Sequence, residues 1–172
     1  MTWKYDGRVR PVFAEEPRQG QQSVWDYPRP PIIETDGRQI VVRARELLVA
    51  DSHRALRVLE TASPPTYYLP PGDVRSELLK PASARSFCEW KGEAVYFDLE
   101  APWERIEHVG WSYPRPRGAF AALAGYLAFY PAKLECYVAD ERVLPQPGGF
   151  YGGWLTGDIA GPVKGSTGSE GW

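Results

Sequence analysis

The segment from Pro145 to Lys164, PQPGGFYGGWLTGDIAGPVK, constrains the fold more than any other part of this chain. It combines many glycines with three large aromatic residues, Phe150, Tyr151 and Trp154. Glycine adopts positive φ easily and lets other groups approach the backbone, but it weakens a helix interior. The aromatic rings supply more apolar area than a disordered linker contains. We therefore expect a fixed loop that closes over a cavity or forms its wall.

Proline and glycine are abundant along the whole chain, with 17 residues of each, and aromatic residues make up 13%. Prolines and glycines interrupt helices, whereas aromatic side chains favour strands and fill small cores. This composition predicts a mainly β fold of antiparallel sheets with one or two short helices. A chain of 172 residues suits one domain. Its weakly patterned start predicts an N-terminal arm over residues 1–22 and a single domain over residues 23–172.

Apolar runs separated by turn-forming residues predict three hairpins and two further strands. The further strands are a short one within Ser63–Asp73 and a longer one at Arg105–Tyr113. The expected hairpins pair Ile40–Val42 with Leu47–Ala50, Phe87–Trp90 with Ala94–Leu99, and Lys133–Val138 with Val143–Leu144.

Other segments are less regular. Residues 53–60 fit either a helix face or a strand. Asp73 is expected to cap a short helical turn, and the alanine-rich Gly118–Ala128 is the best candidate for a helix. The pattern Trp-x-Tyr-Pro-Arg-Pro begins at Trp25 and again at Trp111, which predicts two similar extended segments that contribute to one aromatic core.

Charge and cysteine content argue against several classes of partner. A net charge of −2 provides no electrostatic footprint for nucleic acid or an anionic membrane, so we expect neither partner. The longest apolar run, Ala119–Tyr130, is shorter than the roughly 20 residues that span a bilayer. Cys88 and Cys136 do not form a disulfide framework, and the N-terminus has no apolar core of signal-peptide length. We expect a reducing, cytoplasmic location; the oligomeric state is left open.

Motifs for metal binding and for known catalytic chemistry are missing from the sequence. A structural zinc site needs closely spaced ligands, and a phosphate loop needs Gly-Lys-Ser/Thr between a strand and a helix. Here the lysine of Gly161–Thr167 precedes the glycine, and no Gly-x-Ser-x-Gly nucleophile motif occurs. We therefore expect no metal and no cofactor. The soft or borderline ligands are isolated in the sequence: His53, Cys88, His108 and Cys136.

One carboxylate, Glu60, stands out because it ends an apolar segment and precedes a run rich in proline and tyrosine. A buried carboxylate needs a cation or hydrogen-bond donors, for which Lys91 and Lys164 are candidates. The alternative is an internal ion pair that fixes strand packing. Aromatic residues could line a pocket around this group or could simply fill the core. The candidate ligand-binding residues are Glu60, Tyr68, Lys91, Trp111, Tyr113, Tyr130 and Trp154.

Four stretches resemble a largely bacterial family, domain of unknown function 427, which is sometimes labelled nucleotidyltransferase-like. They are DSHRALRVLETASPPTYYLPPGDV, CEWKGEAVYF, GWSYPRPRGAFAALAGYLAFYP and PQPGGFYGGWLTGDIAGPVKG, and the resemblance covers residues from about Val24 to Trp172. It implies coiled antiparallel sheets of the β-tent type, and it implies no established activity. The positions that match the family pattern are Glu60, Tyr68, Cys88, Lys91, Gly92, Tyr96, Trp111, Tyr113 and Tyr130.

Three functions are compatible with the sequence. The first is a small-molecule-binding domain, in which Trp111, Tyr113 and Trp154 form the walls and Glu60 and Lys91 the polar anchors. The second is an enzyme that acts on a nucleotide or related metabolite, although the Asp-x-Asp pair that would hold magnesium does not occur. The third is a structural or protein-interaction module whose aromatic residues are all core. The sequence therefore leaves open whether the protein is an enzyme.

Overall fold

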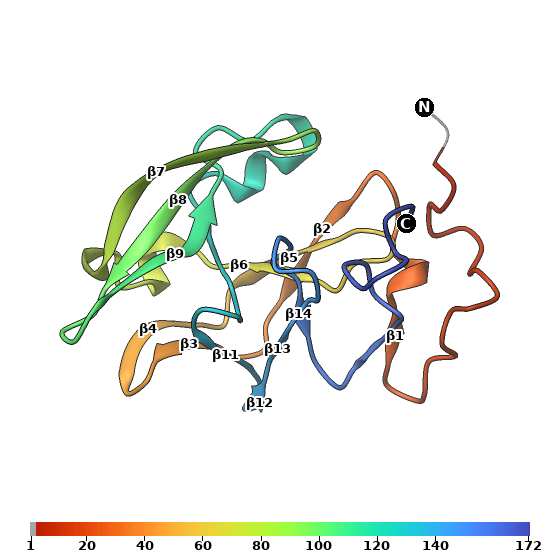
Figure 1. Ribbon diagram of the computed structural model, residues 1–172, viewed down its shortest axis with the longest axis horizontal. Coiled ribbons are helices and arrows are strands. Elements are labelled where there is room, and N and C mark those ends of the chain that lie inside the picture. The colour runs from red at the N-terminus through yellow and green to blue at the C-terminus, as the bar shows by residue number, and fades with distance from the viewer. Residues whose placement is uncertain (1–2) are drawn as a thin grey trace.

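The computed structural model describes residues 3–172 and consists of β-strands joined by loops and short 3-10 helices (Figure 1). The predicted mainly β class, built from several antiparallel sheets, is confirmed. The strands are β1 (Gln22–Ser23), β2 (Ile32–Asp36), β3 (Ile40–Ala44), β4 (Leu47–Ser52), β5 (Ala55–Leu59), β6 (Thr66–Tyr68), β7 (Leu79–Cys88), β8 (Gly92–Glu100), β9 (Arg105–Ser112), β10 (Leu127–Phe129), β11 (Glu135–Val138), β12 (Glu141–Arg142), β13 (Leu144–Pro145), β14 (Trp154–Leu155) and β15 (Ile159–Ala160). The 3-10 helices are η1 (Val24–Asp26), η2 (Pro71–Asp73), η3 (Ser76–Leu78) and η4 (Gly118–Leu123).

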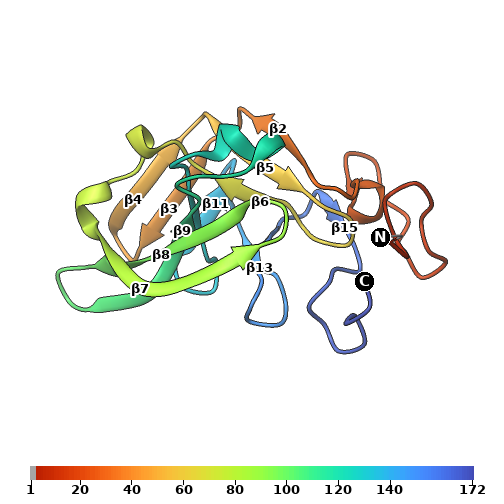
Figure 2. The ribbon, with the colours of Figure 1, turned by 90° about the horizontal axis from the view of Figure 1, so that it is seen from above.

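The first four-stranded sheet has the order β10-β9-β8-β7 and contains the predicted β7–β8 hairpin. Cys88 pairs with Gly92, whose φ of 96° permits the reversal, so Lys91 lies in the turn. Register shifts in both strand pairs indicate bulges, which increase twist and curvature. Figure 2 shows β7 and β8 as long, curved strands along one side of the molecule. One face of this curved sheet packs against the main hydrophobic core.

The second four-stranded sheet has the order β12-β11-β3-β4. The predicted β3–β4 hairpin is confirmed, but the third predicted hairpin differs from the structure. β11 pairs with β12 across a turn at Ala139 and Asp140, whose φ values are 45° and 68°. Positive φ at both positions matches strand twist in a two-residue turn. Leu144 is therefore free to pair with β14 instead.

A three-stranded antiparallel sheet, β2-β5-β6, resolves the ambiguous residues 53–60 as a strand, because β5 pairs with a neighbour on each side. The prediction for Asp73 was wrong. Its carboxylate accepts hydrogen bonds from Ser52 Oγ at 2.7 Å and Arg54 Nη2 at 2.7 Å, and η3, the turn that follows it, has no side-chain cap. Arg54 offers a charged donor, which is a stronger partner than a backbone N–H.

The prediction of a helix over Gly118–Ala128 was also wrong, because only a short 3-10 helix, Gly118–Leu123, forms there. Gly125 has a φ of 74°, and β10 begins two residues later. A continuous α-helix cannot contain a residue at positive φ. Pairing with β9 and burial of Leu127–Phe129 replace the helical hydrogen bonds. None of the helices within residues 3–172 is long and apolar enough to cross a membrane.

The largest core cluster lies between the sheets, and Trp154 belongs to it. The indole of Trp154 is 1% exposed and stacks on Tyr67 at 4.8 Å between ring centroids. Its Nε1 donates a hydrogen bond to the carbonyl oxygen of Phe129 at 3.0 Å. A buried indole with its N–H satisfied stabilises the packing of the C-terminal segment against the sheets.

The N-terminal arm and the C-terminal segment lie side by side at one end of the molecule (Figures 1 and 2). Strand β1 pairs with β15, and Trp25 contacts Phe13 and Trp172 at centroid distances of 5.2 and 5.1 Å. Residues 1–2 of the predicted arm lie outside the described residues. The division after residue 22 stays a prediction.

The two copies of the repeated hexapeptide do not share one core. Trp25 lies in the cluster between the two ends of the chain, whereas Trp111 lies in a second cluster with Tyr68 and Tyr113. Trp25 is also in a 3-10 helix, while Trp111 is in strand β9. The two copies differ in backbone pairing, because Trp111 lies between strands β8 and β10 and pairs with both.

Candidate functional site

A cavity of about 270 Å³ lies where the first and third sheets meet the glycine-rich loop. Six of the seven predicted site residues line it. Strands β6, β9 and the residue after β10 supply aromatic walls, while Glu60 follows β5 and Lys91 lies in the β7–β8 turn. The predicted residues that line this cavity are Glu60, Tyr68, Lys91, Trp111, Tyr113 and Tyr130.

Aromatic contacts fix the walls. Trp111 packs against Tyr130 at 4.5 Å between centroids and meets Tyr68 edge-on at 6.2 Å. Tyr68 also contacts Tyr113 at 6.3 Å. Such tilted and edge-on pairs restrict ring rotation. Burial raises the pKa of Tyr68, Tyr113 and Tyr130 well above the ordinary tyrosine value, so their hydroxyl groups stay protonated and can donate hydrogen bonds.

The glycine-rich loop, here defined as Gln146–Gly153, covers the cavity between β13 and β14. A Cβ at Gly152 would overlap the indole ring of Trp111, so only glycine lets the backbone lie on that ring. Gln146 is 5% exposed, donates from Nε2 to Lys164 O at 2.8 Å and accepts from Gly153 N at 3.1 Å. The loop is therefore held in place, as the glycine and aromatic pattern predicted.

Lys91 is the most unusual polar residue of the site. The residue is only 9% exposed, and within residues 3–172 its ammonium forms no ion pair with a carboxylate. Its Nζ instead lies 5.6 Å from the ring centroid of Tyr113 and 5.8 Å from that of Phe120. Cation–π contacts stabilise an ammonium only partly, so the group retains capacity for an anionic partner.

Lys91 and Lys164 were the expected partners of Glu60, but Glu60 pairs with neither of them. Its Oε1 lies 3.3 Å from Nε of Arg29, whose side chain is 5% exposed. Arg29 also donates to Thr61 O at 2.9 Å. This geometry matches the internal ion pair that was the alternative interpretation. Sequence reasoning missed Arg29 as the partner; its position between two prolines, in an extended segment, was the available signal.

Neither Trp154 nor Lys164 lines the cavity. Trp154 is in the main core, and Nζ of Lys164 lies 5.7 Å from the ring centroid of Tyr151. Further lining residues were outside the predicted set of seven. Among them, the hydroxyl groups of Ser86 and Tyr96 are hydrogen-bonded at 2.8 Å, and Cys88 is a free, half-buried thiol. Within residues 3–172, no group of three His, Cys, Asp or Glu residues could hold a metal ion.

The fold is thus of the mainly β class, with several antiparallel sheets. The site is an aromatic cavity beside Lys91. The family model described as Domain of unknown function (DUF427) matches residues 32–140, so the chain belongs to this family. The match is narrower than the expected Val24–Trp172 and does not include the glycine-rich loop. No curated protein matches the chain. Apart from Gly92, all positions that resemble the family pattern line the cavity.

Proposed function

We propose that this protein binds a small planar molecule carrying an anionic group. Lys91 carries the proposal, because this residue is only 9% exposed and its ammonium pairs with no carboxylate of residues 3–172, so an anionic ligand would supply the missing counter-charge. The tyrosine hydroxyl groups offer further donors, and the rings of Trp111 and Tyr130 offer flat apolar surface. Glu60 contributes mainly by holding Arg29 beside the cavity.

The cavity favours this function over the other two. A structural module whose aromatic residues are all core would have a packed centre, whereas about 270 Å³ is open beside Lys91. An enzyme that transfers nucleotides would need paired carboxylates to hold magnesium, and the described cavity lining contains a single carboxylate, Glu60. Ligand binding needs only the groups that line the cavity.

A thermal-shift comparison tests the proposal. Wild-type protein is screened against benzoate, nicotinate and indole carboxylate, with benzamide and nicotinamide as neutral controls. A bound acid should stabilise the native state by about 2.7 kcal/mol at a hundredfold excess over Kd. The neutral amides should stabilise it less, because they cannot neutralise the ammonium.

Lys91→Met should abolish this stabilisation while leaving the unliganded protein as stable as wild type, to within about 1 kcal/mol, because methionine fills similar space without a buried charge. Lys80→Met is the matched control, since Lys80 is half-exposed and pairs with Glu100. Acids that stabilise Lys91→Met as well as wild type would contradict the proposal. So would a large loss of stability in Lys91→Met, which would make Lys91 structural.

We also propose a cytoplasmic location, with a small molecule rather than nucleic acid or a membrane as the partner. Both cysteines are free thiols, and Cys88 is half-buried beside the cavity, which suits a reducing compartment. The net charge of −2 supports the exclusion of polyanionic partners. Fractionation of cells with an antibody against the protein would test the location.

A further inference from the structure

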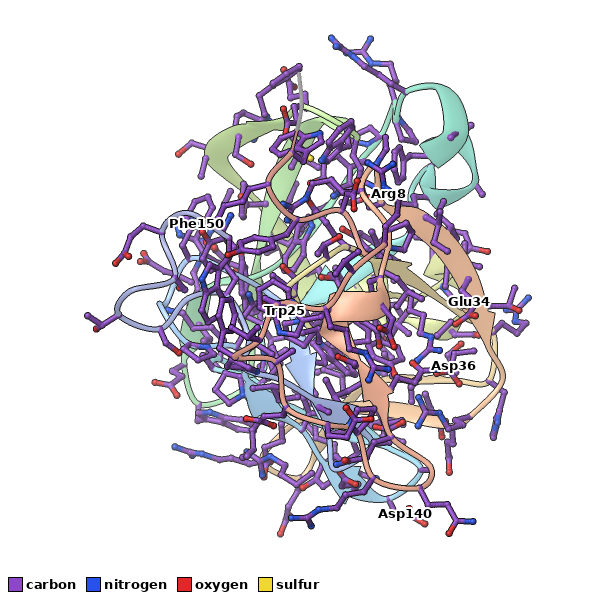
Figure 3. The ribbon with its side chains drawn as sticks, turned by 90° about the vertical axis from the view of Figure 1, so that its right-hand side faces the viewer. Arg8, Trp25, Glu34, Asp36, Asp140 and Phe150 are labelled. Carbon is purple, nitrogen blue, oxygen red and sulfur yellow. The ribbon has the colours of Figure 1, made fainter. Side chains whose placement is uncertain are left out.

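A second hollow, here called the outer groove, adjoins the cavity and has a volume of about 420 Å³. The two hollows share a wall of six residues, so they lie side by side on the molecule. Phe150, on this wall, is 75% exposed and lies on the opposite side of the view from Glu34 and Asp36 in Figure 3. The shared residues are Ser86, Tyr96, Tyr130, Gln146, Phe150 and Tyr151.

Three basic residues from separate parts of the chain meet at the outer groove. Arg85 comes from β7, His108 from β9 and Lys133 from the loop before β11. Of the described residues that line the outer groove, none is acidic. Within residues 3–172, neither Arg85 nor Lys133 forms an ion pair with a carboxylate. This concentration of unneutralised cations contrasts with the net charge of −2 for the whole chain.

Hydrogen bonds fix the guanidinium of Arg85 and the backbone of His108. Nη1 of Arg85 donates to the carbonyl oxygens of Ala82 and Ala84 at 2.8 and 2.7 Å, which leaves its other N–H groups for a ligand. His108 has a φ of 50°, and its backbone N–H donates to Asp98 Oδ1 at 2.8 Å. A left-handed residue within a strand is costly and changes the direction of its side chain.

Asp98 accepts the backbone N–H of His108 and pairs with Arg105, and it does not line the outer groove. Lys133 also lines two neighbouring hollows, one with Glu104 and Glu135 and one with Glu104 and Glu107, so part of its charge acts there. Arg85 and His108 line the outer groove and neither of the two hollows that contain those carboxylates. Arg85 is therefore the main determinant of charge in the outer groove, and Lys133 a contributor.

We infer that the outer groove is an anion subsite that takes a phosphate group carried by the ligand of the cavity. The inference rests on the proposed function. Arginine binds phosphate through parallel N–H donors, and lysine adds a compact charge. A phosphate dianion needs more than one cation, which the outer groove supplies and the single Lys91 of the cavity does not. The ligand class is thus a planar molecule with a phosphorylated tail.

The two histidines make a direct test possible, because the chain contains His53 and His108 and no others. Inorganic phosphate is titrated into wild-type protein while the histidine ring resonances are followed by NMR. The ring signals of His108 should shift in a saturable manner. Those of His53, which lies 3.2 Å from Gly37 O and away from the outer groove, should not. Equal or absent shifts at both rings would overturn the inference.

Variants separate this inference from the proposed function. Affinities for phenyl phosphate, phenol and benzoate are measured in Arg85→Ala/Lys133→Ala, with Arg18→Ala on the exposed arm as a control for the loss of a positive charge outside the outer groove. The double variant should lose about tenfold in phenyl phosphate affinity, the equivalent of about 1.4 kcal/mol, and keep its affinity for benzoate. Phenyl phosphate binding that depends on Lys91 and not on Arg85 would overturn the subsite and leave the proposed function intact. If benzoate does not bind wild type while His108 still responds to phosphate, the proposed function of the cavity is contradicted and the anion subsite in the outer groove is not.

Discussion

Arg29 and Lys91 are both cations with little exposure near one cavity, and they differ in what neutralises them. Arg29 pairs with Glu60 and donates to Thr61 O, so its charge is satisfied inside the protein. The ammonium of Lys91 lies near the rings of Tyr113 and Phe120 and forms no ion pair with a carboxylate among the described residues. A satisfied buried cation stabilises the fold, whereas an unsatisfied one creates a demand for a ligand.

The Arg29–Glu60 ion pair predicts unequal effects of substituting its two members. Arg29→Met should lower the free energy of unfolding by about 2–3 kcal/mol, because it leaves the Glu60 carboxylate and backbone carbonyl oxygens without their donor. Glu60→Gln should cost less, about 1–2 kcal/mol, because the amide oxygen can still accept from Arg29 and only the counter-charge is lost. Urea denaturation of both variants measures the difference. An Arg29→Met protein as stable as wild type would contradict this reading of the ion pair.

Among the elements, the glycine-rich loop decides whether the cavity exists. Its ends are fixed by the β13–β14 pairing and by Gln146, and its middle lies directly on Trp111. The loop therefore supplies one wall of the cavity without contributing a charged group. Its glycines permit close approach of backbone to ring, and they do not act as hinges in this geometry.

Gly152→Ala should accordingly displace the loop from Trp111. We expect a loss of about 1–3 kcal/mol in the free energy of unfolding, the usual cost of overpacking, and weaker binding of benzoate. Gly37→Ala is the matched control, because a Cβ there meets nothing within 4 Å and its φ is not positive. Tryptophan fluorescence during denaturation measures the stability of both variants. Equal stability of the two variants would show that the loop does not rest on Trp111.

At the scale of the whole molecule, buried tyrosines tie the separate sheets together. Burial raises the pKa of Tyr67 to about 12 and raises the pKa of Tyr27, Tyr68, Tyr113 and Tyr130 still further. In the unfolded chain these groups ionise near pH 10. Above that pH the unfolded state therefore binds fewer protons than the native state.

The sign of this linkage predicts alkaline unfolding. Stability contributed by the neutral tyrosines is complete below about pH 10 and is lost as the pH rises through the native values. Ionisation of the buried tyrosines, measured by ultraviolet absorbance, should coincide with loss of the far-ultraviolet circular dichroism signal. Ionisation of all tyrosines at about pH 10 with the β-sheet signal retained would contradict this prediction.

The sequence by itself determined the mainly β class, the β3–β4 and β7–β8 hairpins, and the glycine-rich wall of the cavity. These depend on interactions between residues close in the chain: turn chemistry, alternation, and the need for glycine beside large rings. It also singled out Lys91, Trp111, Tyr113 and Tyr130, which one cavity brings together.

Only the tertiary structure decided the partners of the charged groups and the fate of ambiguous segments. Glu60 meets Arg29, 31 residues earlier, and Asp73 meets Arg54, 19 residues earlier, because sheet packing places them together. Gly118–Ala128 gives up a helix because β9 offers an edge for Leu127–Phe129. Trp154 fills the main core and not the cavity, since Tyr67 and the Phe129 carbonyl satisfy both its ring and its N–H there. Contacts between residues distant in the chain carry these outcomes, and no local pattern encodes them.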